Sequence, residues 1–174
     1  MKRNYFLYII IITAAIVSRL IPHSWNFAPI TAIAIFAAIY LPIRQAVVLP
    51  LVIRFISDVI IGFFSWQLMI AVYLSHLFGV ALGLWVRRNK SFGRVLTAPI
   101  LSAVVFFLVT NFAWLYASYT NDLPGILLAY TNGLPFLRGT LMGDVFYTLA
   151  LVGGYEFALR YSRQSGKVKI DINY

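Results

Sequence analysis

The sequence contains no cysteine among its 174 residues, and charged residues make up only 11% of it. Without cysteine the chain cannot form a disulfide, a thiolate nucleophile or a cysteine-ligated metal site. With so little charge, a soluble domain of this length would lack the polar surface needed to cover its core. A Gly-rich phosphate loop, an HExxH motif and a GxSxG elbow are also missing. We therefore expect no enzyme, no cofactor and no metal.

Apolar residues are abundant instead: 61% of the chain is hydrophobic, and its mean hydropathy is +0.86. A helix rises about 1.5 Å per residue, so roughly 17 to 25 apolar residues cross a bilayer. This predicts an all-α integral membrane protein, a bundle of six transmembrane helices that forms one domain over residues 1–174. The predicted spans are 5–22, 27–41, 46–64, 68–86, 95–119 and 138–161. The second span is short, which is compatible either with little tilt or with a central position in the bundle.

Positive charge, formally +9, alternates between the connections of these spans. Basic residues gather before the first span and after the second, fourth and sixth: Lys2, Arg3, Arg44, Arg87, Arg88, Lys90, Arg94, Arg160, Arg163, Lys167 and Lys169. By the positive-inside rule both termini are cytoplasmic, as in a multi-pass protein of a bacterial inner membrane. Charge that flanks apolar runs favours anionic lipid over nucleic acid as partner. The N-terminus also fits a signal peptide, but its removal would spoil the alternation.

The longest external connection is residues 120–137, which Pro and Gly interrupt. It is too short to cross the membrane, and its ILLAY segment could form an interfacial or re-entrant turn. An ordinary external loop and a lid over a site both remain open.

Polar residues of five spans reach the outer half of the predicted bilayer. Counted from the external helix ends, Asp58 and Asp144 each lie about 9 Å deep, and Arg19, His76 and Asn111 lie in the same half. Ionisable residues at such depth usually face the bundle interior or a wet cavity. This predicts an externally open site for a small polar molecule. Its predicted substrate-binding residues are Arg19, Asp58, His76, Asn111, Trp114, Arg138, Asp144 and Tyr147, with Trp114 and Tyr147 as aromatic walls.

Structural roles compete with this interpretation. Arg54 and Asp58 are spaced i, i+4 and can form an ion pair on their own helix, as can Glu156 and Arg160 near the inner edge. Asp144 has no such neighbour and needs a partner elsewhere, such as Arg19 or Arg138. An Asp58–Asp144 protease is conceivable, but Arg54 would keep Asp58 ionised instead of letting it share a proton.

Small residues four apart let helices approach closely in lipid. Such ridges occur in the fourth, first and second spans: Ser75, Gly79 and Gly83; Ala14 and Ser18; Ala34 and Ala38. Most ridges of this kind pack within a bundle, but one can face a partner subunit.

The stretch RLIPHSWNFAPITAIAIFAAIY (19–40), followed by SD and a Gly in 57–62, resembles the first half of S components of energy-coupling factor (ECF) transporters. The whole chain resembles an uncharacterised bacterial six-helix membrane family distantly related to them, through RLIPHSWNFAPI, SDVIIGF, TNFAWL (110–115) and RGTLMGDVFY (138–147). The resemblance implies a six-helix vitamin-binding fold with its site in the external half. It also implies a transmembrane coupling subunit and paired cytoplasmic ATPases as partners.

S components carry an Ala-xxx-Ala ridge in the first helix, where the coupling subunit docks. The nearest match here is Ala14 and Ser18, a departure from that pattern, and Ala34 and Ala38 are a second option. We therefore expect a substrate-capture subunit for uptake of a vitamin-like or other small polar molecule, with an energising partner or as a facilitator. The alternative is a non-transport scaffold of an envelope complex, whose polar residues only hold the bundle together.

Overall fold

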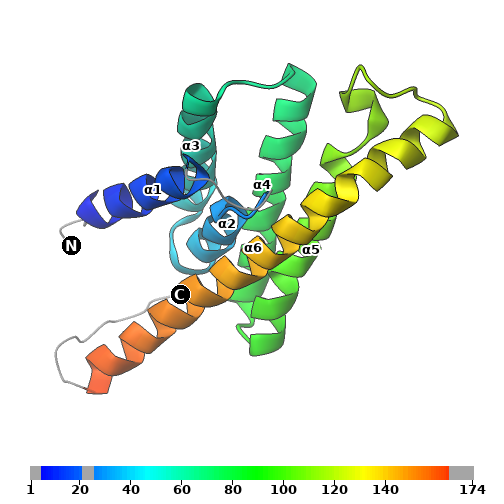
Figure 1. Cartoon of the computed structure of the whole chain (residues 1–174). Helices are drawn as coiled ribbons and strands as arrows, with labels where there is room; N and C mark the ends of the chain where they lie inside the picture. The colour runs from blue at the N-terminus through cyan, green and yellow to red at the C-terminus, as the bar shows by residue number, and fades with distance from the viewer. Residues whose placement is uncertain (1–4, 21–25, 165–174) are drawn as a thin grey trace.

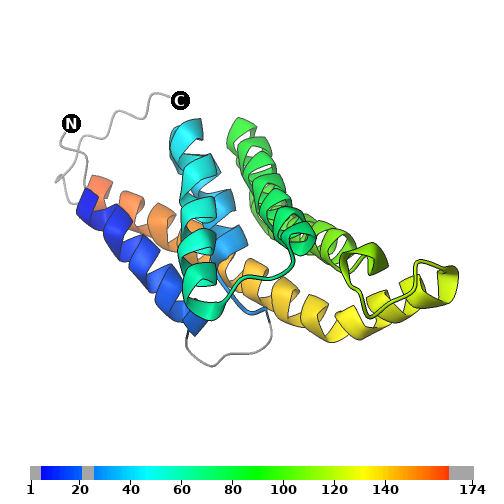
Figure 2. The same cartoon turned by 90° about the horizontal axis from the view of Figure 1, so that it is seen from above.

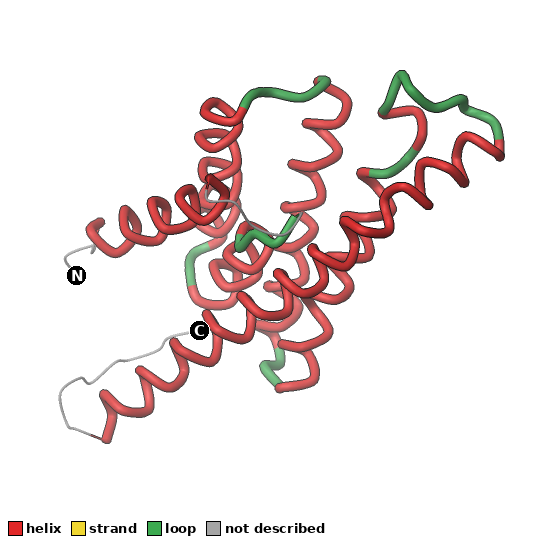
Figure 3. Tube along the Cα trace, viewed as in Figure 1, coloured by secondary structure: helices red, strands yellow, loops and turns green. Residues whose placement is uncertain are grey.

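The computed structural model describes residues 5–20 and 26–164, and these form an all-α chain, as predicted (Figure 1). The described residues form six α-helices and one 3₁₀ turn: α1 (Tyr5–Leu20), α2 (Ile30–Tyr40), α3 (Ile43–Ile61), α4 (Trp66–Arg88), α5 (Phe92–Thr110), η1 (Ala113–Leu115) and α6 (Leu123–Gln164). Figure 3 shows helices joined by loops, with no strand in the described part of the chain. Two described helices, α4 and α5, are long and apolar enough to cross a membrane, and α2 is a shorter apolar helix.

The short helix α2 lies at the centre of the bundle, in contact with α3, α4 and α6 (Figures 1 and 2). Its sequence, ITAIAIFAAIY, is apolar on every side, a pattern typical of a helix that is buried all round. All of its residues except Phe36 and Tyr40 are buried. The other helices therefore pack around α2, and it sets where their inner faces meet.

Helix α4 approaches α2 closely because glycine faces it. A Cβ atom added at Gly83 would lie 2.5 Å from the carbonyl oxygen of Ile35 and 2.6 Å from the Cβ of Ala38. Small residues allow this backbone approach. Ala34 and Ala38 are completely buried within the bundle. They cannot form the partner-docking ridge proposed from the sequence, because no partner can reach them.

Helix α6 begins at Leu123, so the expected external loop over 120–137 is mostly helix and continuous with the sixth span. The carboxylate of Asp122 explains this start, because its Oδ1 accepts a hydrogen bond from the backbone N–H of Gly125 at 3.0 Å. Pro124 lies in the first turn, where the missing N–H removes no intrahelical hydrogen bond. Neither the re-entrant turn nor the plain loop describes this segment.

Helices α3 and α5 both end before the predicted limits of the third and fifth spans, 64 and 119. Gly62 follows α3 with a φ of 113°, in a region that favours glycine. Asn111 ends α5, and its Nδ2 donates to the carbonyl oxygen of Phe107 at 2.9 Å. Asn111 therefore caps a helix instead of lying within one.

The two ends of the bundle differ in charge. The loops over 62–65 and 111–122 lie at one end, and the loop over 89–91 lies at the opposite end (Figure 1). Arg87 Nη1 donates to the carbonyl oxygen of Leu41 at 3.1 Å, so the connection between α2 and α3 reaches this opposite end as well. We call it the basic end, since the arginines and lysine of these connections gather there.

Large apolar side chains cover the outside of the described helices. On α4, Ile70, Leu74 and Phe78 are exposed at successive turns, while Ser75 and His76 on its other side are buried. On α3, α5 and α6 the exposed apolar residues include Phe55, Val59, Ile60, Leu101, Val104, Leu108, Leu127, Leu134 and Phe146. Some polar side chains are thus buried among the apolar residues of the core while large apolar ones are exposed, and an exposed apolar surface of this extent marks a face that contacts lipid or protein.

Candidate functional site

Asp58 of α3 is fully buried and binds two arginines. Its Oδ2 accepts from Nε of Arg54 at 2.8 Å, and its Oδ1 accepts from Nη1 of Arg19 at 3.1 Å. The hydroxyl of Tyr73, on α4, donates to Oδ2 at 3.2 Å. The structure thus contains the Arg54–Asp58 pair that the spacing predicts. Arg19 joins the same carboxylate and does not pair with Asp144.

Helix geometry and one neighbouring hydroxyl assemble this cluster. Arg54 and Asp58 lie one turn apart on the same face of α3. Ser57 precedes Asp58, and its hydroxyl hydrogen-bonds the carbonyl oxygen of Ile53 at 2.9 Å. Arg19 Nη1 donates to the Ser57 oxygen as well as to Asp58, which ties α1 to α3. The side chains of Arg19 and Arg54 are only 10% and 11% exposed, so the cluster lies inside the bundle.

A second buried cluster joins α2, α4 and α6. Thr31 Oγ1 lies 3.4 Å from Nδ1 of His76, and Asp144 lines the same cavity as these two residues. All three residues are buried. Among the described residues, Nε2 of His76 and Oδ2 of Asp144 have no hydrogen-bond partner. An unpaired buried polar atom costs about 1–3 kcal/mol, so its presence calls for a functional explanation.

Both clusters meet in a cavity of about 260 Å³, which we call the inner chamber. Arg19 and Arg54 contribute the basic part of its wall, and Thr31, His76 and Asp144 contribute the neutral and acidic part. These side chains come from α1, α2, α3, α4 and α6, so almost every helix of the bundle supplies part of this chamber.

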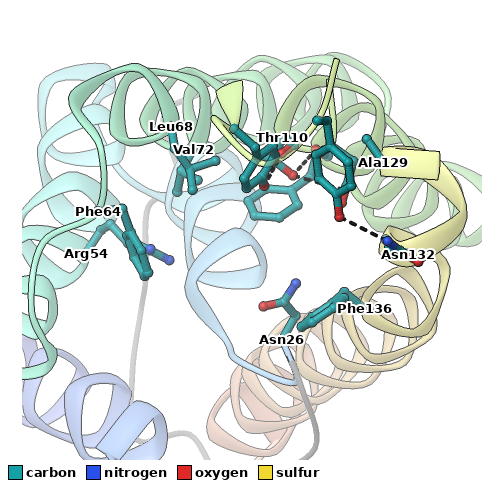
Figure 4. A pocket seen from close by; sticks show the side chains of 14 residues that line it. Asn26, Arg54, Phe64, Leu68, Val72, Thr110, Ala129, Asn132 and Phe136 are labelled. Carbon is teal, nitrogen blue, oxygen red and sulfur yellow. Dashed lines mark hydrogen bonds between the residues drawn. The ribbon is translucent and has the colours of Figure 1, made fainter. Parts of the chain in front are cut away.

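Figure 4 shows a neighbouring cavity of about 340 Å³, the outer chamber. Phe64, Tyr116 and Tyr119 line it, so it lies towards the loops over 62–65 and 111–122, opposite the basic end. Phenylalanines supply much of its apolar wall, and its polar side chains are those of Asn26, Arg54, Thr110, Asn111, Tyr116, Tyr119 and Asn132. The Nδ2 of Asn132 donates to the hydroxyl of Tyr119 at 3.1 Å, which links α6 to the segment after η1 (Figure 4).

The two chambers adjoin each other. Asn26, Arg54 and Phe106 line both of them. Figure 4 shows the Arg54 side chain beside Phe64, with its guanidinium group on the side of the cavity. The Arg54 guanidinium carbon lies 5.8 Å from the centre of the Phe64 ring, a contact that orients it. A ligand that fills both chambers would therefore pass this arginine.

The chambers bring together half of the predicted substrate-binding residues. Arg19, His76 and Asp144 line the inner chamber, and Asn111 lines the outer one. Asp58 lines neither chamber, but both arginines that it binds line the inner one, and Arg54 also lines the outer one. Four of the residues predicted from their depth thus line the two cavities.

Three predicted residues lie elsewhere. Trp114 is 57% exposed and Arg138 is also exposed, and neither lines either chamber. Tyr147 packs its ring 5.2 Å from that of Phe27 and is likewise outside the chambers. Trp114 lies in η1, beyond the end of α5, and Arg138 and Tyr147 lie on α6 but point away from the chambers, which depth alone does not specify.

The second predicted ion pair has a different partner. Glu156 binds Lys90, from the loop between α4 and α5, and accepts from the hydroxyl of Tyr40 at 2.6 Å. Arg160, expected to pair with it, is exposed and forms no ion pair with it at hydrogen-bond distance. The contact lies at the basic end and joins α2, α6 and the α4–α5 loop, in place of the predicted pair within α6.

Sequence reasoning missed several residues of the two clusters. Thr31 is the only hydroxyl side chain of the apolar run over 27–39, a signal that was available. Tyr73 lies one turn before His76 on α4, so a shared helix face could have linked them. Asn26 gave no signal, because its φ of 60° and its place in both chambers depend on the fold.

Within residues 5–20 and 26–164, the fold and site define a class: an all-α bundle with two adjoining polar cavities near one end. No group of three His, Asp or Glu in this part of the chain could hold a metal ion. Residues 1–166 match the model of a family of unknown function (DUF6580), and the chain belongs to this family. No curated protein and no solved structure matches. The family match provides no link to S components of ECF transporters.

Proposed function

We propose that the chain is a membrane-embedded substrate-capture subunit, similar to S components of ECF transporters, that binds a vitamin-like or other small polar molecule for uptake. The two adjoining chambers carry the proposal, since they hold charged and hydrogen-bonding side chains inside a bundle with an apolar exterior. Small-molecule sites typically measure roughly 300–1,000 Å³, and the chambers together fall in that range.

The exterior supports embedding of the whole bundle in a bilayer. Exposed large apolar side chains recur at successive turns of α4 over residues 66–78 and along α3, α5 and α6. In this proposal α4 and α5 span the membrane by their own length, and α2 packs inside without meeting lipid. The basic end lies in the cytoplasm, because positive charge is retained on that side. The chambers lie towards the opposite, external face, where a captured molecule arrives.

An energising partner is part of the proposal, since no nucleotide-binding motif occurs in the sequence. The remaining candidate for docking a coupling subunit is the ridge of Ala14 and Ser18 on α1. Ala14 is exposed, and the Ser18 hydroxyl is turned back to the carbonyl oxygen of Ala15 at 2.8 Å. Both features leave a small, smooth helix face of the kind that close helix packing requires.

Binding is tested on the purified protein in nanodiscs by thermal shift against a panel of water-soluble vitamins, with mass spectrometry of any co-purified small molecule. We expect at least one compound to raise the unfolding temperature. Asn132→Ala, in the outer chamber, should weaken that compound's binding by about 2- to 10-fold, the range for one neutral hydrogen bond. Asn121→Ala is the matched control, because Asn121 is exposed in the loop before α6 and lines neither chamber. If no compound binds, the scaffold alternative replaces capture.

Orientation is tested separately with single cysteines, which the cysteine-free sequence makes unambiguous. Asn121→Cys should react with a membrane-impermeant maleimide on intact cells, and Asn89→Cys should react only after permeabilisation. Both positions are exposed, at opposite ends of the bundle. The reverse pattern would place the chambers towards the cytoplasm and exclude capture from outside.

A further inference from the structure

The inner chamber contains charged groups of both signs that are not paired with one another. Arg19 and Arg54 both bind Asp58, and among the described residues no cation lies within ion-pair distance of Asp144. Asp144 is only 2% exposed. A carboxylate buried to this extent needs a compensating charge or hydrogen-bond donors, because the apolar surroundings do not replace its hydration.

Hydrogen-bond chemistry specifies what Asp144 and His76 can receive. When Asp144 is ionised, its carboxylate only accepts hydrogen bonds, so its unpartnered Oδ2 needs a donor. In the tautomer in which Nδ1–H of His76 donates to the Thr31 oxygen, 3.4 Å away, Nε2 of the neutral imidazole carries no proton. In this state Nε2 of His76 and Oδ2 of Asp144, which both lack a partner, are both acceptors. A group with several N–H donors, such as an ammonium group, satisfies both.

The basic part of the wall of the inner chamber supplies hydrogen-bond donors and so requires an acceptor from the ligand. A guanidinium group has five N–H donors, and Asp58 uses only Nε of Arg54. Arg54 lines both chambers, and Figure 4 shows its guanidinium group on the side of the outer one. Guanidinium groups bind carboxylates with charge-assisted hydrogen bonds. Arg54 can thus receive a ligand carboxylate while Nε stays on Asp58.

We propose that this site selects a compact zwitterion, whose ammonium group is bound by Asp144 and His76 and whose carboxylate is bound by Arg54. The proposal rests on the capture function proposed above and names its ligand class. Arg19 and Arg54 balance Asp58 and Asp144 in formal charge, so a ligand with no net charge leaves the buried site neutral. A simple anion would leave Asp144 without a counter-charge, and a simple cation would do the same for the arginines.

The test compares matched small molecules on the unmodified protein in nanodiscs. The probes are the straight-chain ω-amino acids from glycine to aminohexanoate, which vary the distance between the charges. Each is paired with the carboxylic acid that lacks the amino group and with the amide that lacks the carboxylate. We expect one chain length to bind about tenfold or more tighter than both of its counterparts, the range for a hydrogen bond to a charged group.

A substitution at Asp144 tests whether this residue binds the ammonium group. Asp144→Asn should abolish the preference for the amino acid over the matched acid and leave the weak binding of the acid unchanged. Asp122→Asn is the control, since it removes the same charge at an exposed position outside both chambers, and asparagine also caps a helix. The comparison of ligands on the unmodified protein decides the question even where Asp144→Asn does not fold.

The results separate this inference from the function on which it rests. If a vitamin binds but no amino acid is preferred over its acid and amide, the zwitterion is excluded and capture stands. If Asp144→Asn weakens the amino acid and the acid equally, Asp144 does not bind the ammonium group, and the assignment fails. If neither panel binds, the proposed function itself fails.

Discussion

Replacing Asp58 by asparagine tests whether charge balance holds the arginine cluster together. Asp58→Asn keeps the size of the side chain but removes the carboxylate with which Arg19 and Arg54 form their ion pairs. Removing one partner of a buried pair costs about 3–5 kcal/mol, because an uncompensated charge stays buried. The cluster has a net formal charge of +1 before the change and +2 after it. We therefore expect the upper part of this range.

Arg54→Gln is the informative comparison, since it changes the charge in the other direction. The remaining Arg19 and Asp58 then form a neutral pair at 3.1 Å. Arg54→Gln should cost less than Asp58→Asn, and adding it to Asp58→Asn should restore part of the lost stability. A second mutation that stabilises the first is the signature of an electrostatic interaction between the sites.

Unfolding is followed by tryptophan fluorescence during a thermal ramp in detergent micelles, for the two single variants and the double variant. The four tryptophans of the chain provide the signal. If Asp58→Asn costs no more than Arg54→Gln, or if the double variant is the least stable of the three, charge balance does not hold the cluster and the reasoning is refuted.

Three further changes test the packing. Gly83→Ala should destabilise by about 1–3 kcal/mol, as overpacking does, because its Cβ would meet the backbone of α2 at 2.5 Å. Gly154→Ala should stabilise by roughly 0.5–1 kcal/mol, since no atom lies within 4 Å of the added Cβ and alanine favours the helix. Equal effects of Gly83→Ala and Gly154→Ala in thermal unfolding would contradict the close contact between Gly83 and α2. Gly133→Ala would place its Cβ 2.2 Å from Oδ1 of Asn111, so it should weaken ligand binding in thermal-shift titrations more than it lowers stability. Hydrogen bonds from Thr120 and Gly125 lower the pKa of Asp122. The helix cap that Asp122 forms should therefore persist above the usual pKa of an aspartate, about 4, and weaken as the pH falls below that value, which lower protection of the Gly125 amide against hydrogen exchange would report. Equal protection in Asp122→Ala would refute this cap.

The helices could be predicted from the sequence because apolar runs of this length have few alternatives, but their ends could not. The end of α5 depends on the side chain of Asn111 bonding back to Phe107. The start of α6 depends on Asp122 receiving the Gly125 amide. Proline and glycine in 120–137 suggested a loop, yet Pro124 falls in the first turn, where proline is tolerated. Capping is a matter of single hydrogen bonds, which the hydrophobic pattern does not reveal.

The layer of the candidate site could also be predicted, because a rigid helix converts residue number into depth. Rotation about the helix axis is a separate quantity, which depends on which helices are neighbours. That is why Asp144 reaches the chamber while Tyr147, on the same helix, packs on Phe27. It is also why Arg19 binds Asp58 and not Asp144. Helix order around α2 decides these pairs, and no local pattern in the sequence encodes it.

A buried ion cluster need not stabilise a fold. Replacing the cluster of Arg19, Arg54 and Asp58 by apolar residues can therefore distinguish the capture function from the scaffold alternative. Replacing a buried ion cluster by apolar residues of similar volume is often neutral or stabilising by about 1–4 kcal/mol. The triple variant Arg19→Met, Arg54→Met, Asp58→Leu should therefore unfold at or above the temperature of the unmodified protein.

If the cluster exists to bind a ligand, this triple variant keeps its fold but loses the compound that the unmodified protein binds. Asp122→Asn, assayed beside it, should keep both. If the triple variant is as unstable as Asp58→Asn, the arginines and Asp58 form structural contacts that apolar packing cannot replace, and the scaffold alternative is favoured. Stability and binding thus answer different questions about the same side chains, and only their combination separates a ligand site from internal packing.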